Sequence, residues 1–516
     1  MSTLSNLLHA TALTFGDRPA IHDEAGDLNW RQYVDRIACT AGVLHDLGLR
    51  AGQRFAILCR NSALQGQLIY AGYWAGVVPV PLNFRLSVSE IAQMIEDAEC
   101  DIVMVDNAFV DLLDQPALAR WKARALLIPV DGADDRLPSI TTLVARAQAL
   151  PPHASEENDD AILLYTGGTT GRGKGVRLTH RNVVSNALQL SRVMNAREDD
   201  VYLHVSPMFH STDLKATVVT MFGGAHVYLK EFSVDGVLEA VERHRVTILS
   251  MVPTMVVRIL REANLANYDL SSLRLISYGT SPITETTLRA AMKAFPDADF
   301  HQCYGLTETS PVLALLDEVA HRRALDSRPE LLRAAGRLLP AVDLRIIAVD
   351  GSILPKGEIG EIVARGPQIA KGYLNRPEED AATFQAGWFH TGDIGKIDEE
   401  GYLHVLDRKK EMVITGGENV YTREVENVLD KHAAVLEIAV VGVPDAKYGE
   451  ALLAVLVAAP GQAIPPDEEL IEFCRGKLGG FKIPRKFMAV DTLPRTSLGK
   501  VRKHDLVKQY LSALEQ

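Results

Sequence analysis

A glycine-rich segment between two apolar runs is the feature that most restricts how this chain folds. Five glycines and three threonines fall within the eleven residues from Tyr165 to Gly175. Apolar residues 161–164 precede the segment, residues 176–178 follow it, and an amphipathic stretch begins near Asn182. This pattern predicts a strand, a loop, a short strand and a helix. Free backbone N–H groups, hydroxyls and the Lys174 cation together form an anion site, for which phosphate is the usual ligand.

The loop also partly fits the P-loop found in many nucleotide hydrolases. Gly168, Gly173 and Lys174 match its G-x4-G-K spacing. However, Gly175 stands where that loop needs a Ser or Thr hydroxyl on Mg²⁺, and strand-like residues follow instead of a helix. An ordinary glycine-rich surface loop is a second alternative, and the loop by itself does not exclude it.

Composition narrows the class of protein. A chain of 516 residues predicts two to four domains and a large core. The apolar content of 47% and the charged content of 23% are those of an ordinary soluble globular protein. The net charge of −12 argues against a nucleic-acid partner, which would require a basic face.

Cysteine usage and hydropathy predict a cytoplasmic protein. The five cysteines are scattered without a C-x-x-C pair, so metal and disulfide sites are disfavoured and a reducing compartment fits. Residues 1–20 lack a basic segment followed by an apolar core, so we expect no signal peptide. No run of 18 apolar residues occurs, so we expect no membrane span.

The first 155 residues alternate between helical patterns and short apolar runs. Strands are predicted at 55–58, 78–82 and 101–105, and a helix over 87–98. Such alternation is typical of a parallel sheet with helices on both faces. Prolines at 79 and 81 restrict the second run to an edge strand, because neither residue can donate to a ladder.

The glycine-rich loop also carries a family resemblance. Its sequence, Y-T-G-G-T-T-G-R-G-K-G, resembles the phosphate loop of the adenylate-forming superfamily, which includes acyl-CoA synthetases, aryl-CoA ligases, luciferases and adenylation domains. Gly173 replaces the usual proline, which should make the loop more mobile. Further motifs of this superfamily follow in its order: P-M-F-H before residue 211, Y-G-L-T-E, W-F-H-T-G-D, G-G-E-N-V-Y and, near the C-terminus, P-R-T-S-L-G-K.

The resemblance implies a fold and a domain division. We expect an α/β protein with a large multi-sheet N-terminal domain, residues 1–407, that binds ATP and the acyl group. A small mobile α+β C-terminal domain, residues 408–516, should carry the catalytic lysine and rotate about a hinge near Lys410. No linker composition marks this boundary, so its position depends on the resemblance.

The same resemblance assigns ligand-binding residues. We expect Tyr304 at the adenine, Thr307 at the α-phosphate, and Glu308 at Mg²⁺, a cation that prefers carboxylate and phosphate oxygens. Considered alone, Glu308 could equally be exposed to solvent, and Asp393 could cap a turn. The residues expected to bind ATP or CoA are Thr166, Gly167, Gly168, Thr169, Thr170, Gly171, Lys174, Gly279, Thr280, Ser281, Tyr304, Asp393, Arg408, Lys410, Gly416 and Gly417.

Three of these assignments have a simple chemical basis. The carboxylate of Asp393 can accept from both ribose hydroxyls at once. Gly416 and Gly417 would let the narrow pantetheine arm of CoA pass close to the backbone. Lys500 would bring a compact positive charge to the carboxylate and α-phosphate, where negative charge develops. Without the resemblance, Lys500 is simply an exposed lysine after a Pro/Gly-bounded loop.

The segment after the P-M-F-H motif departs from the family pattern. His210 would line or gate the acyl site, and we include it among the catalytic candidates, although a lone histidine after an apolar strand is more often structural. Asp213 and Lys215 stand where many relatives have small or apolar residues. They are expected to pair locally or face solvent, and the alternative is that one of them contacts a polar group on the substrate.

The resemblance therefore implies an ATP- and Mg²⁺-dependent carboxylic acid–CoA ligase that acts through an acyl-adenylate. Its substrates would be a fatty or aryl (hydroxycinnamic) acid, ATP and CoA, and a homodimer is common in such families. One alternative is an adenylating enzyme that loads a carrier-protein phosphopantetheine, and another is a non-catalytic binding paralogue. The G-G-E-N phrase and the absence of an obvious carrier domain favour the first, and intact Thr307, Glu308, Asp393 and Lys500 argue against the last.

Overall fold

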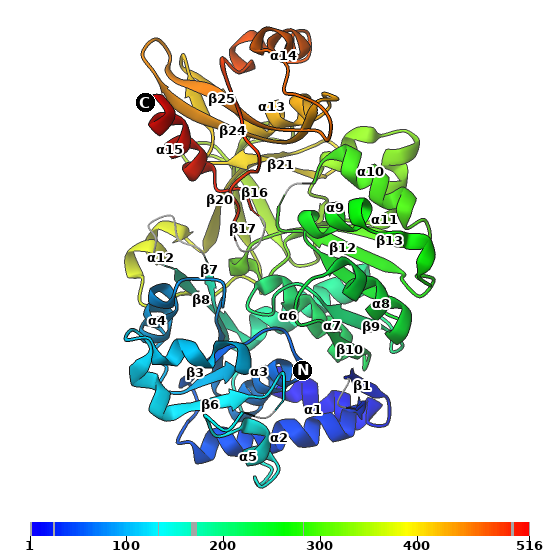
Figure 1. The fold of residues 1–516 in the computed structure, drawn as a ribbon, viewed down its shortest axis with the longest axis vertical. Coiled ribbons are helices and arrows are strands. Elements are labelled where there is room, and N and C mark those ends of the chain that lie inside the picture. Colours follow the sequence, from blue (N-terminus) through cyan, green and yellow to red (C-terminus); the bar gives the residue numbers. More distant parts are fainter. Residues whose placement is uncertain are drawn as a thin grey trace.

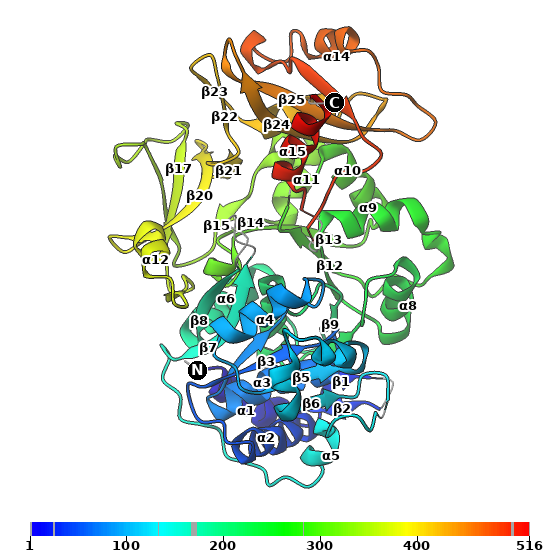
Figure 2. The same cartoon turned by 60° about the vertical axis from the view of Figure 1, so that its left-hand side comes forward.

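Four sheets and their helices form the lower part of the molecule, and the last hundred residues form a separate sheet above them (Figures 1 and 2). The computed structural model describes residues 3–23, 26–132, 134–166, 173–281, 283–496 and 500–514. The predicted α/β architecture, a large multi-sheet N-terminal domain followed by a small α+β domain, is confirmed.

The first sheet is a parallel one, as the alternating pattern predicts. Its strand order is β4 (Val78–Pro81), β3 (Arg54–Leu58), β5 (Val103–Asp106) and β6 (Ala125–Ile128), all paired in parallel. The proline-containing β4 is at the edge, as predicted. Helices of this part of the chain are α1 (Leu4–Phe15), α2 (Trp30–Asp46), α3 (Ala63–Ala75), α4 (Val88–Asp97) and α5 (Ile140–Val144).

The second sheet has nine strands, and its central run is parallel. The order is β15 (Arg337–Leu338), β14 (Ala314–Leu316), β13 (Asp299–Tyr304), β12 (Leu275–Gly279), β11 (Ile248–Met251), β9 (Val201–His204), β10 (Ala225–Tyr228), β1 (Pro19–His22) and β2 (Leu28–Asn29). One face packs on α8 (Val234–His244), α9 (Pro253–Glu262), α10 (Glu285–Ala294) and α11 (Glu318–Asp326). The other face packs on α6 (His180–Val193) and α7 (Ala216–Met221).

The glycine-rich loop joins the two strands of a hairpin, in agreement with the predicted strand, loop, strand and helix. β7 (Asp160–Thr166) and β8 (Lys174–Thr179) are antiparallel, α6 follows at once, and β18 (Gly372–Tyr373) completes this sheet. A five-stranded antiparallel sheet comes next in the chain. It contains β16 (Asp343–Ile347), β17 (Gly360–Arg365), β19 (Phe384–Gln385), β20 (Trp388–Ile397) and β21 (Leu403–Arg408), with α12 (Pro377–Thr383) before β19.

The C-terminal sheet begins five residues after β21 ends. Its strands are β23 (Glu418–Val420), β22 (Val413–Thr415), β25 (Gly449–Ala458), β24 (Val435–Asp445) and β26 (Lys486–Ala489). Its helices are α13 (Thr422–Leu429), α14 (Asp467–Cys474) and α15 (Lys503–Leu514). Arg408 is the last residue of β21, so the chain passes from one sheet to the next within residues 409–412, and the division at 407/408 stays a prediction.

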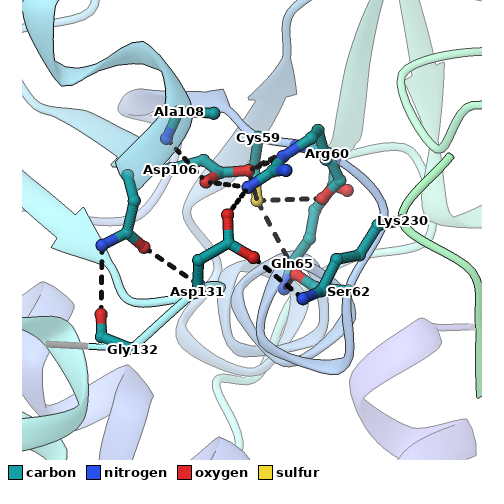
Figure 3. Close-up of polar contacts among 10 residues, drawn as sticks. Cys59, Arg60, Ser62, Gln65, Asp106, Ala108, Asp131, Gly132 and Lys230 are labelled. Atoms are coloured by element: carbon teal, nitrogen blue, oxygen red, sulfur yellow. Dashed lines mark hydrogen bonds and ion pairs between the residues drawn. The ribbon is translucent and has the colours of Figure 1, made fainter.

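A buried ion cluster fastens the carboxyl ends of β3 and β5 (Figure 3). The Arg60 guanidinium donates from Nε and Nη2 to the Asp106 carboxylate, at 2.8 Å each, and also contacts Asp131. Lys230, from the segment after β10, donates to the second oxygen of Asp131 at 2.9 Å. Asp106 is fully buried, so Arg60 supplies the counter-charge that this carboxylate requires.

Two expectations about the chain as a whole can be compared with the structure. All five cysteines are free, as their scattered spacing predicts. Throughout the described ranges, every helix is too short or too polar to cross a bilayer.

Replacing Arg60 by methionine should destabilise the N-terminal domain. The substitution leaves the buried Asp106 carboxylate without its partner, which costs about 3–5 kcal/mol of the free energy of unfolding. Urea unfolding followed by tryptophan fluorescence measures this, because all four tryptophans precede residue 408. Arg136→Met, which breaks an exposed pair with Asp111 and Asp134, is the matched control and should leave the midpoint unchanged. Equal midpoints for the two variants would contradict the prediction.

Candidate active site

The ends of β12 and β13 form the floor of the site. Gly279 is the last residue of β12 and pairs with Cys303 of β13. A Cβ at Gly279 would lie 2.3 Å from the Cys303 carbonyl oxygen, so only glycine fits there. The chain turns after Gly279, at Thr280, which has a positive φ of 67° and is followed by Ser281. The carboxyl ends of parallel strands are the usual ligand-binding edge of such sheets.

Asp393 is the centre of a three-residue cluster. Tyr304, the last residue of β13, donates its hydroxyl hydrogen to Asp393 Oδ2 at 2.7 Å, and Arg408 Nε lies 2.8 Å from Oδ1. Asp393 belongs to β20 and pairs with Arg408 of the neighbouring strand β21, so it does not cap a turn. A carboxylate has about four lone-pair positions, so both oxygens can still accept from ribose hydroxyls.

Thr307 and Glu308 lie one turn beyond Tyr304, in the short 3-10 helix η5 (Thr307–Thr309). Glu308 is buried, not solvent-exposed, and its Oε1 accepts from the Tyr373 hydroxyl at 2.7 Å. The Lys174 ammonium lies 5.1 Å from the centre of the Tyr373 ring. Thr307 Oγ1 lies 3.2 Å from the Ser211 hydroxyl. One carboxylate, one ammonium and several hydroxyls therefore converge at this point.

This arrangement fits a Mg²⁺ ion held mainly by phosphate oxygens. Oε2 of Glu308 has no partner within the described ranges, so it can serve as an inner-sphere or water-mediated ligand. The described residues contain no group of three or more His, Cys, Asp or Glu side chains that could cage a cation. Mg²⁺ characteristically uses one or two carboxylates and completes its octahedron with phosphates and water.

Lys500 reaches this site from the C-terminal domain. Its side chain remains exposed, but Arg408, Glu411, Asp393 and Lys410 are close enough to influence its charge. Desolvation by the surrounding protein, followed by the Arg408 cation, lowers the pKa of Lys500 to about 8. Desolvation, outweighing the neighbouring Glu411 carboxylate, likewise lowers the pKa of Lys410. The structure thus brings Lys410 and Lys500 together with the Asp393 cluster.

Gly416 and Gly417 lie in a hairpin of the C-terminal sheet. They form the two-residue turn between β22 and β23, with positive φ values of 61° and 86°. Such values are those of a type I′ hairpin turn, which favours glycine at both positions. Gly416 N–H donates to the Tyr448 carbonyl of the same domain at 2.9 Å. The hairpin alone accounts for both glycines, and their contact with CoA stays a prediction.

Some predicted residues lie outside the described ones: Gly167, Gly168, Thr169, Thr170 and Gly171. The two ends of their loop are described, and Thr166 pairs with Lys174 as the last rung of the β7–β8 ladder. This rung fixes where the loop leaves and rejoins the sheet.

His210 begins a short 3-10 helix, η3 (Ser211–Lys215). Its Nδ1 accepts from the Thr212 backbone N–H at 3.2 Å and lies 2.7 Å from the Thr212 hydroxyl. Burial, with a smaller effect from Lys215, lowers the pKa of His210 to about 4. The imidazole is therefore neutral at pH 7, with its hydrogen on Nε2. This geometry gives His210 a helix-capping role, and a part in catalysis stays a prediction.

Asp213 and Lys215 neither pair with each other nor face solvent. Asp213 Oδ1 lies 2.7 Å from His204 Nδ1, and Lys215 Nζ donates to Ser277 Oγ at 2.8 Å. Lys215 is only 3% exposed. The expectation of local pairing or exposure is therefore wrong, because η3 packs against β9 and β12 instead of lying on the surface.

Sequence reasoning missed two neighbours of the site, Ser277 and Tyr373. Tyr373 lies 65 residues after Glu308, and Ser277 lies 62 residues after Lys215. No local pattern marks either contact. The polar residues after His210 were the one available signal, since an ammonium and a carboxylate there depart from the family pattern.

Comparison with known proteins places this chain in a family. Residues 8–374 match the description AMP-binding enzyme, and residues 424–500 match its C-terminal domain. A feruloyl-CoA synthase of Amycolatopsis sp. is 35% identical over 507 residues, 97% of this chain and 96% of the relative.

Solved structures agree. ATP-bound MatB from Rhodopseudomonas palustris has a TM-score of 0.88 and 35% identity, covering 98% of this chain and 99% of its own. The o-succinylbenzoate CoA synthetase of Bacillus subtilis, bound to its acyl-adenylate intermediate, has a TM-score of 0.84 and 31% identity, covering 97% of each chain.

Lys500 should react as an unusually acidic lysine. Trace acetylation across a pH series, followed by mass spectrometry, should give it a pKa of about 8. Arg408→Met should raise that pKa towards the ordinary value, because it removes the nearest cation that disfavours the ammonium. Lys503, whose ammonium pairs with Glu426 at 2.9 Å, is the control and should show a raised pKa. An ordinary pKa for Lys500 in the unaltered protein would mean that it does not occupy this site in solution.

Proposed function

The chain belongs to the family of AMP-binding enzymes, and from this premise we propose that it activates an aryl carboxylic acid. It is an ATP-dependent acid–thiol ligase. The acid reacts with ATP to give an acyl-adenylate and pyrophosphate, and CoA then replaces AMP to give the acyl-CoA. The observation that carries the proposal is the position of Lys500. This C-terminal-domain lysine lies beside Asp393 and Arg408 of the preceding sheet, where a nucleotide would be bound between the two domains.

In the first step the substrate carboxylate attacks the α-phosphorus of ATP. A bond forms between a carboxylate oxygen and phosphorus, the bond to the β-phosphate oxygen breaks, and pyrophosphate leaves. Asp393 and Tyr304 would hold the ribose and adenine, and Thr307 and Lys500 would stabilise the negative charge that develops around phosphorus. Mg²⁺ bound at Glu308 would neutralise phosphate charge.

In the second step the thiol sulfur of CoA attacks the acyl carbon. The carbon–oxygen bond to AMP breaks, the thiol proton is released, and the thioester and AMP leave. We propose that the C-terminal domain turns about Lys410 between the steps, which withdraws Lys500 and brings the Gly416–Gly417 turn to the site. Residues 409–412, the only chain between β21 and β22, would supply the torsional freedom.

The proposed class of acid comes from the similar proteins. They include a feruloyl-CoA synthase and an o-succinylbenzoate CoA synthetase, whose names are taken from acids that carry an aromatic ring. Each aligns over nearly the whole chain. A cytoplasmic location and a homodimer stay predictions, which cell fractionation and static light scattering would test.

The test of the proposal is pyrophosphate release with Mg·ATP against a panel of acids. Ferulate, cinnamate, indoleacetate and 2-succinylbenzoate represent aryl acids, and hexanoate and palmitate represent fatty acids. We expect a burst with an aryl acid alone and steady turnover once CoA is added, because the acyl-adenylate is released slowly without a thiol. Turnover with fatty acids and with none of the aryl acids would overturn the aryl assignment. Pyrophosphate release that CoA never accelerates would indicate a carrier protein as acceptor.

Lys500→Ala should separate the two steps. Pyrophosphate release should fall by roughly 100- to 1000-fold, the usual effect of removing one group that stabilises developing charge. Thioester formation from supplied acyl-adenylate should stay near its original rate. In the unaltered enzyme the first step should also slow as pH rises through about 8, because Lys500 is cationic only below its lowered pKa, whereas the second step should not. An equal loss in both steps would contradict the domain rotation.

A further inference from the structure

Lys215 is a buried cation that the proposed chemistry does not use. It ends η3, immediately before α7, and is 3% exposed. Its Nζ donates to Ser277 Oγ at 2.8 Å, and Ser277 Oγ lies 3.4 Å from Cys303 Sγ of the neighbouring strand. These contacts use one of the three ammonium hydrogens and place the group between η3, β12 and β13.

The position of Lys215 relates it to the reacting end of the site. Ser211, at the other end of η3, lies 3.2 Å from Thr307, which we place at the α-phosphate. A 3-10 helix rises about 2.0 Å per residue, so the four residues from Ser211 to Lys215 span about 8 Å. Ser277 stands two residues before Gly279 on β12. Lys215 and the Thr307 contact are therefore at opposite ends of η3, and the ammonium is bound to the same strand that ends at Gly279.

No carboxylate in the described chain neutralises this cation. The described residues include none within 4 Å of Nζ, and the nearest acidic side chain in sequence, Asp213, is held by His204 at 2.7 Å. The titratable groups that act on Lys215 are the Cys303 thiol and Asp213, and Lys215 in turn acts on His210. Desolvation outweighs them and lowers the pKa of Lys215.

Three partly buried cations of this chain, Arg60, Arg274 and Lys503, show what is missing. Arg60 lies against the fully buried Asp106, and Arg274 Nη2 lies 2.6 Å from Asp200, which is 1% exposed. Lys503 pairs with Glu426 at 2.9 Å. Each has an anion because an uncompensated charge in a protein interior costs several kcal/mol. Lys215 alone among these four has only a hydroxyl.

We propose that Lys215 forms an anion subsite that binds a second carboxylate on the acid being activated. Resting on the proposed function, this names the substrate class as an aryl acid with two carboxylates, one that reacts and one that stays ionised beside Lys215. Such a substrate supplies the counter-charge on binding, so the ion pair forms only in the complex. An acid with an apolar far end would instead leave the ammonium desolvated and unpaired.

Two matched pairs of acids test this. One is 2-succinylbenzoate and the same acid without its ring carboxylate, 4-oxo-4-phenylbutanoate. The other is 4-carboxycinnamate and cinnamate. For the unaltered enzyme, we expect at least one dicarboxylate to have a higher kcat/KM for pyrophosphate release than the monocarboxylate matched to it. Lys215→Met should lower the value for that dicarboxylate by roughly 100-fold and leave the value for the monocarboxylate unchanged or improved, because only the dicarboxylate loses a partner for its second charge. Lys215→Arg should retain the preference.

The outcomes are distinguishable. The subsite would be overturned if the unaltered enzyme preferred monocarboxylates, or if Lys215→Met lowered kcat/KM equally for both acids of a pair. Turnover of ferulate would in that case still support the proposed function. If no aryl acid is activated, the proposed function fails and the subsite with it. The ratio of kcat/KM within a pair should also fall as pH rises through the lowered pKa of Lys215, and this ratio cancels the pH dependence that Lys500 gives to both acids.

Stability supplies a readout that does not depend on activity. Without substrate, Lys215→Met should leave the urea midpoint of tryptophan fluorescence unchanged or raised, because it removes an unpaired buried charge and adds an apolar group of similar volume. Adding 2-succinylbenzoate should raise the midpoint of the unaltered protein more than that of the variant. A lowered midpoint, like that expected for Arg60→Met, would show a structural lysine and contradict the proposal.

Discussion

The pair between Asp393 and Arg408 is the contact on which the rest of the site depends. It crosses from β20 to β21 at the point where the N-terminal sheets end, and Tyr304 brings the end of β13 to the same carboxylate. Three separate segments are thereby held in register around one buried anion. Arg408 also acts on Lys500 from the other domain. Arg408 therefore both completes the pairing of β20 with β21 and adds to the desolvation that lowers the pKa of Lys500.

Much of the architecture could be predicted because it is encoded locally. Alternating apolar runs indicated the parallel first sheet, prolines 79 and 81 indicated its edge, and the glycine-rich segment indicated a hairpin loop before α6. The domain arrangement and the AMP-binding family came from motifs in order, and the family matches confirm them. These features need only neighbouring residues or a fixed order of short motifs.

The contacts that define charge and specificity could not be predicted. Tyr373 meets Glu308 across 65 residues, and Lys215 meets Ser277 across 62, so neither contact leaves a trace in local composition. Burial changes what a polar residue means, because Lys215, which its sequence would place in solvent, is 3% exposed and bonded to Ser277 in the structure. Gly279 is a further example, since the reason that only glycine fits there is its pairing with Cys303, 24 residues later in the chain.

The prolines of β4 also keep two sheets apart. Val78 and Leu82 donate towards β3, so positions 79 and 81 point outward, where neither proline has a hydrogen to offer. β7 runs beside β4, yet the two strands belong to different sheets. A strand edge that presents backbone acceptors without donors cannot form a hydrogen-bonded ladder with a neighbouring strand. The hairpin that bears the glycine-rich loop therefore shares hydrogen bonds with β18 and not with the first sheet, against which β7 packs only through side chains such as Leu163.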